Sequence, residues 1–422
     1  MNIRFFGGKT LSMAENDQIS NDEVWIKDDK ILYIGKAKPA DFSWDREIDL
    51  KGNLLLPGFK NAHTHSAMTF LRSFADDLPL LDWLQKQVFP MEAKLNADDI
   101  YWLSRLAILE YLSSGMTANF DMYYHPEAVA SASVDSGFRT VLCGEINDFS
   151  GSVSELSARY EAFNKLHPLI NYRLGFHAEY TCSDSLLREI SSLAAALHAP
   201  VYTHLAECAD EVSGCFERHN ASPAQYLSEL GIFENGGGGF HCVHMSDEDL
   251  KIFRDKKLWV ISNPGSNAKL ASGTARLCEM DKMGIPIALG TDGPASNNCL
   301  DMFREMFLAT ALQKLKYNDA SVMDAASVLK MAAVNGARAM GLSNCDCLAP
   351  GKQADICVIS LQHPNMQPEN NIIKNIVYSG SKQNVALTMV AGKILYENGS
   401  YKVGEQPEYI YKKANEIISR IK

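Results

Sequence analysis

The sequence predicts an α/β protein: a (β/α)8 barrel of the TIM type with a composite β-sandwich domain formed by the N- and C-terminal segments. Two patterns indicate this fold. Apolar segments of strand character alternate with helical segments through the middle of the chain, and short strands return at both ends. The 422 residues, 46% of them apolar and 22% charged, suffice for a barrel with one accessory domain.

The N-terminal segment, residues 1–57, has the pattern of short strands. Residues 24–33 alternate apolar and polar side chains around Asp28-Asp29, which predicts a hairpin. A further strand is expected over residues 47–56. These strands are too few to bury a core alone. We therefore expect strands from the far end of the chain to complete the domain.

The middle segment, residues 58–350, is expected to form the barrel. Its eight strand candidates are residues 58–65, 115–123, 139–146, 172–180, 200–207, 238–245, 258–263 and 286–293. Its helix candidates are residues 97–114, 183–198, 247–256, 274–283, 300–316 and 321–340. An open doubly wound sheet is the alternative, but no G-x-G-x-x-G loop follows the first strand. Gly236 to Gly239 precede a strand and are interpreted as a flexible loop.

The C-terminal segment, residues 351–422, returns to strands. Residues 354–361 predict one strand, and residues 385–396 predict a hairpin that turns at Ala391-Gly392. Residues 406–422 have the pattern of a closing surface helix. This segment is therefore the expected partner of residues 1–57 in the sandwich domain.

Charge and composition exclude several classes of partner. The chain has 40 Lys and Arg against 51 Asp and Glu, a net charge of −11, which argues against nucleic acid and anionic membranes. No apolar run approaches the roughly 20 residues of a membrane span, and residues 1–11 do not resemble a secretion signal. The ten cysteines lack a disulfide spacing, and Cys345 and Cys347 alone are weak evidence for a metal site. We expect a cytoplasmic protein with reduced thiols.

Polar residues gather where strands of the predicted barrel end. The first strand ends in His63-Thr64-His65, whose two imidazoles point to one face. The fifth ends in His204 followed by Glu207, the sixth carries His241 and His244, and the eighth ends in Asp292. Three imidazoles and a carboxylate suit Zn²⁺ or a similar divalent ion. Each motif alone could be packing or a turn, but their coincidence at four strand ends predicts a metal site.

These motifs resemble the amidohydrolase superfamily. Pro57 to His65 (PGFKNAHTH) is similar to its first-strand signature. The motifs THLAE at Thr203 to Glu207, HCVH at His241 to His244 and TDGPASNN at Thr291 to Asn298 are similar to those of its aminohydrolase branch. Within that branch the chain most resembles the 5′-methylthioadenosine/S-adenosylhomocysteine deaminase group, over essentially its whole length.

The resemblance implies one divalent metal ion held by four ligands: His63, His65, His204 and Asp292. Zn²⁺ is the preferred ion, and Fe²⁺, Ni²⁺ or Mn²⁺ would also suit the ligands. Binuclear members usually carry a lysine on a middle strand, and residues 172–180 contain none. Glu207 is implied as the proton carrier, His241 as a partner of the attacking water, and Asp292 as its proton acceptor. His244 is interpreted as a packing or supporting histidine.

Two further residues are implied as substrate contacts, Glu92 for ribose hydroxyls and His177 for a purine nitrogen. Without the resemblance, Glu92 would be interpreted as a solvated helix residue and His177 as a core histidine. Members that accept S-adenosylhomocysteine hold its carboxylate with arginines after the third strand, but residues 141–155 contain no Arg or Lys. Arg139 or Arg159 remains a candidate to replace these carboxylate-binding arginines.

We therefore expect a metal-dependent aminohydrolase that deaminates an adenine nucleoside and releases ammonia. Adenosine, 5′-deoxyadenosine and 5′-methylthioadenosine are favoured over S-adenosylhomocysteine. The alternative is an aminohydrolase or chlorohydrolase acting on guanine, a pterin or a triazine. A non-catalytic barrel is disfavoured because every expected ligand is present. The partner is a small molecule, and family habit suggests a homo-oligomer.

Overall fold

A closed ring of parallel strands forms the centre of the protein. The structure, a computed structural model, describes residues 1–14, 18–74, 76–78 and 83–422. Within this part of the chain, eight strands form one sheet in sequence order. They are β8 (Phe59–Thr64), β9 (Met116–Met122), β10 (Arg139–Cys143), β11 (Ile170–Ala178), β12 (Val201–Leu205), β13 (Gly237–His241), β14 (Trp259–Ser262) and β15 (Ile287–Leu289). Their parallel pairing confirms the predicted barrel.

The barrel closes between its first and last strands, β8 and β15. The backbone N–H of Asp292 donates a hydrogen bond to the carbonyl of His63, at 3.0 Å. Asn61 completes the seam: its Oδ1 accepts from the backbone N–H of Thr291 at 2.8 Å, and its amide donates to the Thr291 hydroxyl at 2.7 Å. This seam holds Asp292 beside His63 at the mouth of the barrel.

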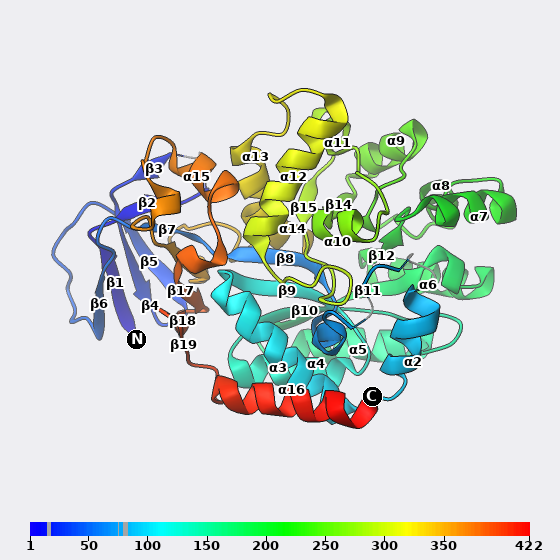
Figure 1. Ribbon diagram of the computed structural model, residues 1–422, viewed down its shortest axis with the longest axis horizontal. Helices are drawn as coiled ribbons and strands as arrows, with labels where there is room; N and C mark the ends of the chain where they lie inside the picture. Colours follow the sequence, from blue (N-terminus) through cyan, green and yellow to red (C-terminus); the bar gives the residue numbers. More distant parts are fainter. Residues whose placement is uncertain (15–17, 75, 79–82) are drawn as a thin grey trace.

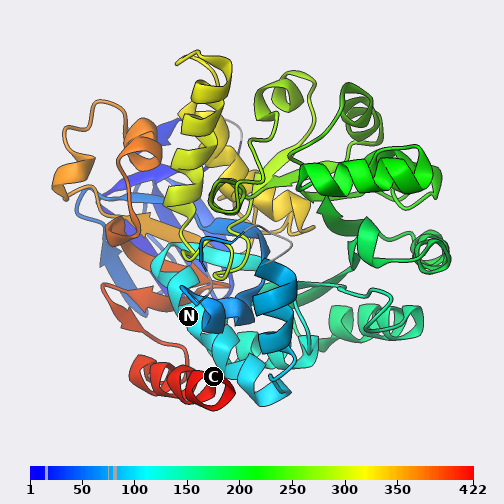
Figure 2. The ribbon, with the colours of Figure 1, turned by 45° about the vertical axis from the view of Figure 1, so that its right-hand side comes forward.

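Helices surround the barrel (Figure 2). The longer ones are α3 (Ala97–Ser113), α4 (Pro126–Ser136), α5 (Val153–Leu166), α6 (Asp184–Leu197), α7 (Ala209–His219), α8 (Pro223–Glu229), α9 (Asp247–Lys256) and α12 (Met302–Tyr317). The shorter ones are η1 (Ser66–Leu71), η2 (Leu84–Val88), α2 (Phe89–Glu92), η3 (Glu179–Thr181), α10 (Pro264–Lys269), α11 (Leu277–Lys282), α13 (Ala325–Lys330), η4 (Met331–Asn335) and α14 (Gly336–Ala339). Capping boxes begin α3 at Asn96 and α9 at Ser246. The predicted helix 321–340 is divided by the π-helical turn η4.

Both ends of the chain build the accessory sheets, which lie side by side in Figure 1. One sheet has the order β5-β4-β1-β6 and the other β19-β18-β17-β16-β7-β2-β3. N-terminal strands are β1 (Asn2–Phe6), β2 (Lys9–Leu11), β3 (Ile19–Ser20), β4 (Glu23–Lys27), β5 (Lys30–Gly35), β6 (Arg46–Asp49) and β7 (Leu54–Pro57). C-terminal strands are β16 (Ile356–Ile359), β17 (Val385–Val390), β18 (Lys393–Glu397) and β19 (Ser400–Tyr401). Because β7 pairs antiparallel with β16, the composite nature of the domain is confirmed. The boundaries 57/58 and 350/351 stay a prediction.

Two local expectations were wrong. Residues 47–56 form not one strand but two, β6 and β7, which belong to different sheets. The left-handed residues Lys51 and Gly52, with φ of 50° and 82°, turn the chain between them. The glycines before the sixth barrel strand are not a loop, since β13 already begins at Gly237. A Cβ at Gly237 would lie 1.9 Å from the carbonyl oxygen of Val201, so the close approach of β12 requires glycine there.

The closing helix α16 (Pro407–Ile421) is confirmed and lies along α3 at the outside of the barrel (Figure 1). Arg420 of α16 forms an ion pair with Asp99 of α3. The C-terminal part also contains η5 (Pro364–Met366), α15 (Ile372–Tyr378) and η6 (Lys382–Asn384). Among the described residues, no helix combines the length and apolar character that crossing a membrane requires.

A buried ion pair joins the barrel to the accessory domain. The guanidinium of Arg139, at the start of β10, donates to both carboxylate oxygens of Asp355, at 2.9 and 3.0 Å. Asp355 directly precedes β16, and Nζ of Lys60 lies 3.9 Å from its Oδ2. All three side chains are buried. Arg139 is therefore already paired, and it lies at the end of the barrel opposite the strand-end histidines.

Candidate metal centre and active site

Four of the predicted site residues converge on one point at the mouth of the barrel. Nε2 of His63 and Nε2 of His65, both from the end of β8, lie 3.5 and 3.3 Å from Oδ1 of Asp292. Nε2 of His204, from β12, lies 3.4 Å from Nε2 of His65. Tetrahedral ligands about 2.0–2.1 Å from an ion are about 3.3–3.4 Å apart. These separations match the spacing of metal ligands. Two overlapping groups could hold an ion: His63 with His65 and Asp292, and His63 with His204 and His241.

Hydrogen bonds orient two of the three histidines. Nδ1 of His65 and Nδ1 of His204 donate to the backbone carbonyls of Met122 and His177. This leaves Nε2 of each imidazole directed into the cluster. His63 differs: within the described residues, neither of its buried ring nitrogens has a hydrogen-bond partner. A buried imidazole without a partner fits a metal ligand.

Two serines hold the carboxylate of Asp292. The hydroxyls of Ser266 and Ser296 both donate to its Oδ2, each at 2.6 Å. Oδ1 is thereby left to face the histidines. Asp292 has a left-handed backbone, with φ of 58°, just before Gly293. The turn, the seam and the two serines together fix this carboxylate.

The electrostatics of the cluster also suit a cation. Burial lowers the pKa of His63 to about 3 and that of His204 well below its usual value, so both imidazoles are neutral and could bind a metal ion. Burial also lowers the pKa of His65, but Asp292 outweighs it and raises that pKa to about 9. Although burial alone would raise the pKa of Asp292, His63 and His65 hold it well below the usual range. A divalent ion would replace the proton on His65.

Glu207 and His241 lie beside this cluster. Glu207 follows β12, and burial raises the pKa of its carboxyl. Its backbone N–H and that of Ala206 donate to the two carboxylate oxygens of Glu211, at 2.8 and 2.7 Å. Nδ1 of His241 donates to Oδ1 of Asn267 at 2.8 Å and lies 3.8 Å from Oε1 of Glu207. The other nitrogen of His241 is thereby free to face the cluster.

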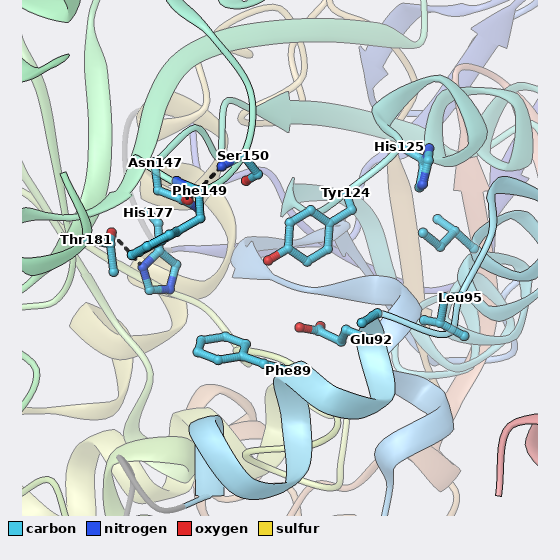
Figure 3. Close-up of a pocket in the computed structure, with 12 residues that line it drawn as sticks. Phe89, Glu92, Leu95, Tyr124, His125, Asn147, Phe149, Ser150, His177 and Thr181 are labelled. Carbon is cyan, nitrogen blue, oxygen red and sulfur yellow. Dashed lines mark hydrogen bonds between the residues drawn. The ribbon is translucent and has the colours of Figure 1, made fainter.

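Two connected cavities lead to these groups. The inner one, about 50 Å³, is lined by His65, His204, Glu207, His241 and Asp292, together with Trp83 and other residues. The outer one, about 600 Å³, shares Phe89, Glu92, Tyr124 and His177 with it. Figure 3 shows Phe89 and Glu92 on one side of the outer cavity, facing Tyr124, Phe149 and His177 on the other.

The predicted substrate contacts Glu92 and His177 both line these cavities. Glu92, in α2, accepts a hydrogen bond from the Tyr123 hydroxyl at 2.6 Å, and burial raises its pKa to about 7. Nδ1 of His177 lies 3.2 Å from the Thr181 hydroxyl, and burial lowers its pKa to about 4. His177 is therefore neutral, with one ring nitrogen available to a ligand.

Other charged candidates lie elsewhere. The ring of His244 donates to the carbonyl of Ser272 at 2.7 Å and lines a separate surface cavity. Nε of Arg159 donates to Glu127 at 3.1 Å, in a side cavity. Arg139 is held by Asp355 at the far end of the barrel. Among the described residues that line the inner and outer cavities, none is Lys or Arg.

Sequence reasoning missed several residues that the fold brings to the site. Ser266 and Asn267 follow β14, the seventh strand, and Ser296 follows the eighth. The run Asn263 to Asn267 (NPGSN) was a detectable signal, because it follows a strand end as the other motifs do. Glu211 had no comparable signal, since it is one acidic residue among many.

The barrel, with three histidines and an aspartate gathered beside an acid and a further imidazole, has the features of the metal-dependent barrel hydrolases. A family model described as the amidohydrolase family matches residues 54–395. The chain belongs to the amidohydrolase family, and it is a hydrolytic enzyme of the aminohydrolase kind.

Particular relatives are similar over the full chain. A 5-methylthioadenosine/S-adenosylhomocysteine deaminase of Thermoanaerobacter pseudethanolicus is 39% identical, with all of both chains covered. A protein of the same name from Caldanaerobacter subterraneus subsp. tengcongensis is 38% identical over 99% of each chain. Among solved structures, an adenosine deaminase from Xanthomonas campestris with bound zinc has a TM-score of 0.94 and 28% identity, covering 99% of this chain and 98% of that one.

Proposed function

We propose that the protein hydrolyses the exocyclic amine of an adenine nucleoside and releases ammonia. The observation that carries this proposal is that one cavity is lined by His65, His204, Asp292, Glu207, His241 and Glu92. His63 joins two overlapping groups of these residues, each of which could hold a metal ion. The relatives named 5-methylthioadenosine/S-adenosylhomocysteine deaminase and the solved adenosine deaminase support the proposal. The substrate is a small nucleoside.

One divalent ion is assigned to His63, His65, His204 and Asp292. The unpartnered imidazole of His63 and the separations within the cluster support this assignment. The zinc of the solved relative favours Zn²⁺, although Fe²⁺, Ni²⁺ or Mn²⁺ suits the same ligands. β11 offers no lysine for a second ion. When bound, the ion lowers the pKa of water from about 15.7 towards about 7 and so supplies hydroxide at neutral pH.

The protein's own groups move the protons. Asp292 accepts a proton from the water as its oxygen attacks the ring carbon that bears the amine. Glu207 protonates the adjacent ring nitrogen and then transfers a proton to the departing ammonia. His241 accepts a hydrogen bond from the attacking water through the ring nitrogen that Asn267 does not occupy. Of the two water protons, one ends on the ring nitrogen and the other on ammonia, which balances the hydrolysis.

Glu92 and His177 orient the substrate. The carboxylate of Glu92 accepts hydrogen bonds from the two ribose hydroxyls, and its raised pKa is lowered again once those donors are bound. His177 presents a neutral ring nitrogen to the purine. Phe89 and Trp83 line the inner cavity and keep water from the base.

S-adenosylhomocysteine is the less favoured substrate. Its carboxylate needs a cationic partner, yet the described lining of both cavities holds none, and Arg139 and Arg159 are each paired with an acid elsewhere. Adenosine, 5′-deoxyadenosine and 5′-methylthioadenosine lack this charge. They are therefore the favoured substrates.

An ammonia-release assay on zinc-replete protein tests the proposal. The substrates are adenosine, 5′-deoxyadenosine, 5′-methylthioadenosine and S-adenosylhomocysteine, with guanine, a pterin and a chlorotriazine as the alternative class. We expect turnover of the first three and much slower turnover of the rest. Release from guanine, the pterin or the triazine without release from the nucleosides would overturn it.

A further inference from the structure

Glu145 is a partly buried acid at the site, and the reaction described above gives it no role. It follows β10 and lines the inner cavity together with His65 and Glu92. It also lines a side cavity of about 230 Å³, together with Tyr124. Within the described part of the chain, its buried Oε2 has no hydrogen-bond partner.

An unpartnered carboxyl oxygen at this place is costly for the protein alone. Leaving a buried polar atom unsatisfied costs about 1–3 kcal/mol. Burial, with Glu92 and Asp121 nearby, raises the pKa of Glu145 to about 8, while His65 acts in the opposite direction. Leucine or alanine would occupy the position without these costs. A donor supplied by the ligand would remove them.

The proposed substrate contacts indicate which group of the nucleoside could donate a hydrogen bond to Glu145. Glu207 and His177 hold the base at the ends of β12 and β11, and Glu92 holds the two ribose hydroxyls. The sugar then has one substituent left, on C5′. Glu145 follows the end of β10, lines the inner cavity with Glu92 and Tyr124, and interacts electrostatically with both.

We propose that Glu145 is a specificity-determining residue that accepts a hydrogen bond from an amine or hydroxyl on C5′ of the nucleoside. This inference rests on the proposed function and narrows its substrate class. An ammonium group on C5′ forms the strongest interaction, because it favours the ionised form of Glu145 and pairs with it. A hydroxyl on C5′ is stabilised less by Glu145. A methyl or methylthio group there is not stabilised at all, and a carboxylate is repelled.

The test compares three substrates of the zinc-loaded enzyme: 5′-amino-5′-deoxyadenosine, adenosine and 5′-deoxyadenosine. In the wild type, kcat/KM for the amine should exceed that for the deoxy compound by about tenfold or more, as expected for a charge-assisted bond. Glu145→Gln, which keeps a carbonyl acceptor but loses the charge, should remove most of the preference for the amine and keep part of that for the hydroxyl. Glu155→Gln, an exposed acid of the side cavity, should leave both preferences unchanged.

The outcomes separate this inference from the proposed function. Turnover of all three nucleosides without a preference for the amine or hydroxyl would overturn the role of Glu145 and leave the deaminase assignment standing. No ammonia from any of them would overturn the deaminase assignment itself. The wild-type preference requires no variant, so the inference stays falsifiable even if Glu145→Gln fails to fold. A preference that survives unchanged in folded Glu145→Gln would also overturn it.

Discussion

The carboxylate of Glu211 accepts the backbone N–H of Glu207 at 2.8 Å, and so the first turn of α7 holds the residue proposed to carry protons. The same carboxylate accepts the N–H of Ala206, whose φ of 50° lies in the left-handed region. A strained turn after β12 thus depends on one buried acid. Glu211 is a positioning residue for Glu207.

Glu211→Ala should lower kcat about tenfold while changing KM little, because the loop shifts without loss of a substrate contact. Glu211→Gln, which keeps one carbonyl acceptor, should recover part of the rate. Glu217→Gln, exposed on the same helix, is the matched control. A change confined to thermal stability, with kcat intact in Glu211→Ala, would contradict the positioning role.

Glu207→Gln should keep its metal content and lower kcat by at least about 100-fold, the usual scale of lost general acid–base help. The amide is similar in shape but cannot shuttle a proton. Steady-state kinetics with metal analysis by mass spectrometry measures both quantities. Near wild-type turnover would show that another group carries the proton.

Removal of the metal should abolish ammonia release and lower the unfolding temperature, because a bound ion stabilises only the folded state. Added Zn²⁺ should restore both. Asp292→Ala should retain less metal than the wild type, since one ligand of the cluster is gone. Full activity of the chelated protein, with no residual metal by analysis, would be incompatible with the proposed centre.

Glu92→Gln should lower kcat/KM for adenosine by about tenfold or more, because a charged acceptor of two hydroxyls is lost. Turnover of a base without ribose, where it can be measured, should be far less sensitive. An equal loss for substrates with and without ribose would point to a role for Glu92 outside sugar binding.

Asp355→Asn should destabilise the protein by about 3–5 kcal/mol near neutral pH, because it leaves the buried guanidinium of Arg139 without its counter-charge. Although burial opposes it, Arg139 lowers the pKa of Asp355 below its usual 3.8. The contribution of the ionised carboxylate is therefore complete above pH 3.8 and is lost as the pH falls through the lowered pKa.

Chemical denaturation at several pH values measures this effect. The gap in unfolding free energy between the wild type and Asp355→Asn should be constant near neutrality and narrow in acid. Asp255→Asn, in an exposed ion pair with Arg254, should change stability far less. A gap that widens as the pH falls would contradict this account.

The fold was largely predictable because its signals are local. Alternating strand and helix patterns marked the barrel, and the hairpin at Ala391-Gly392 was visible in the turn residues. A metal site at the strand ends was predicted because parallel strands of a closed barrel end at one rim. The resemblance to the amidohydrolase superfamily implied His63, His65, His204 and Asp292 as its ligands. The place of each short motif at the end of a predicted strand therefore indicated that its side chains lie at the mouth of the barrel.

The chain by itself thus determined the architecture, the strand ends and the chemistry gathered on them. Only the tertiary structure decided which distant groups complete the site: Glu211 beneath Glu207, Ser266 beside Asp292, and Glu145 without a partner. It also decided that β6 and β7 enter different sheets. Such contacts arise from the packing of elements far apart in sequence, and no local periodicity records them.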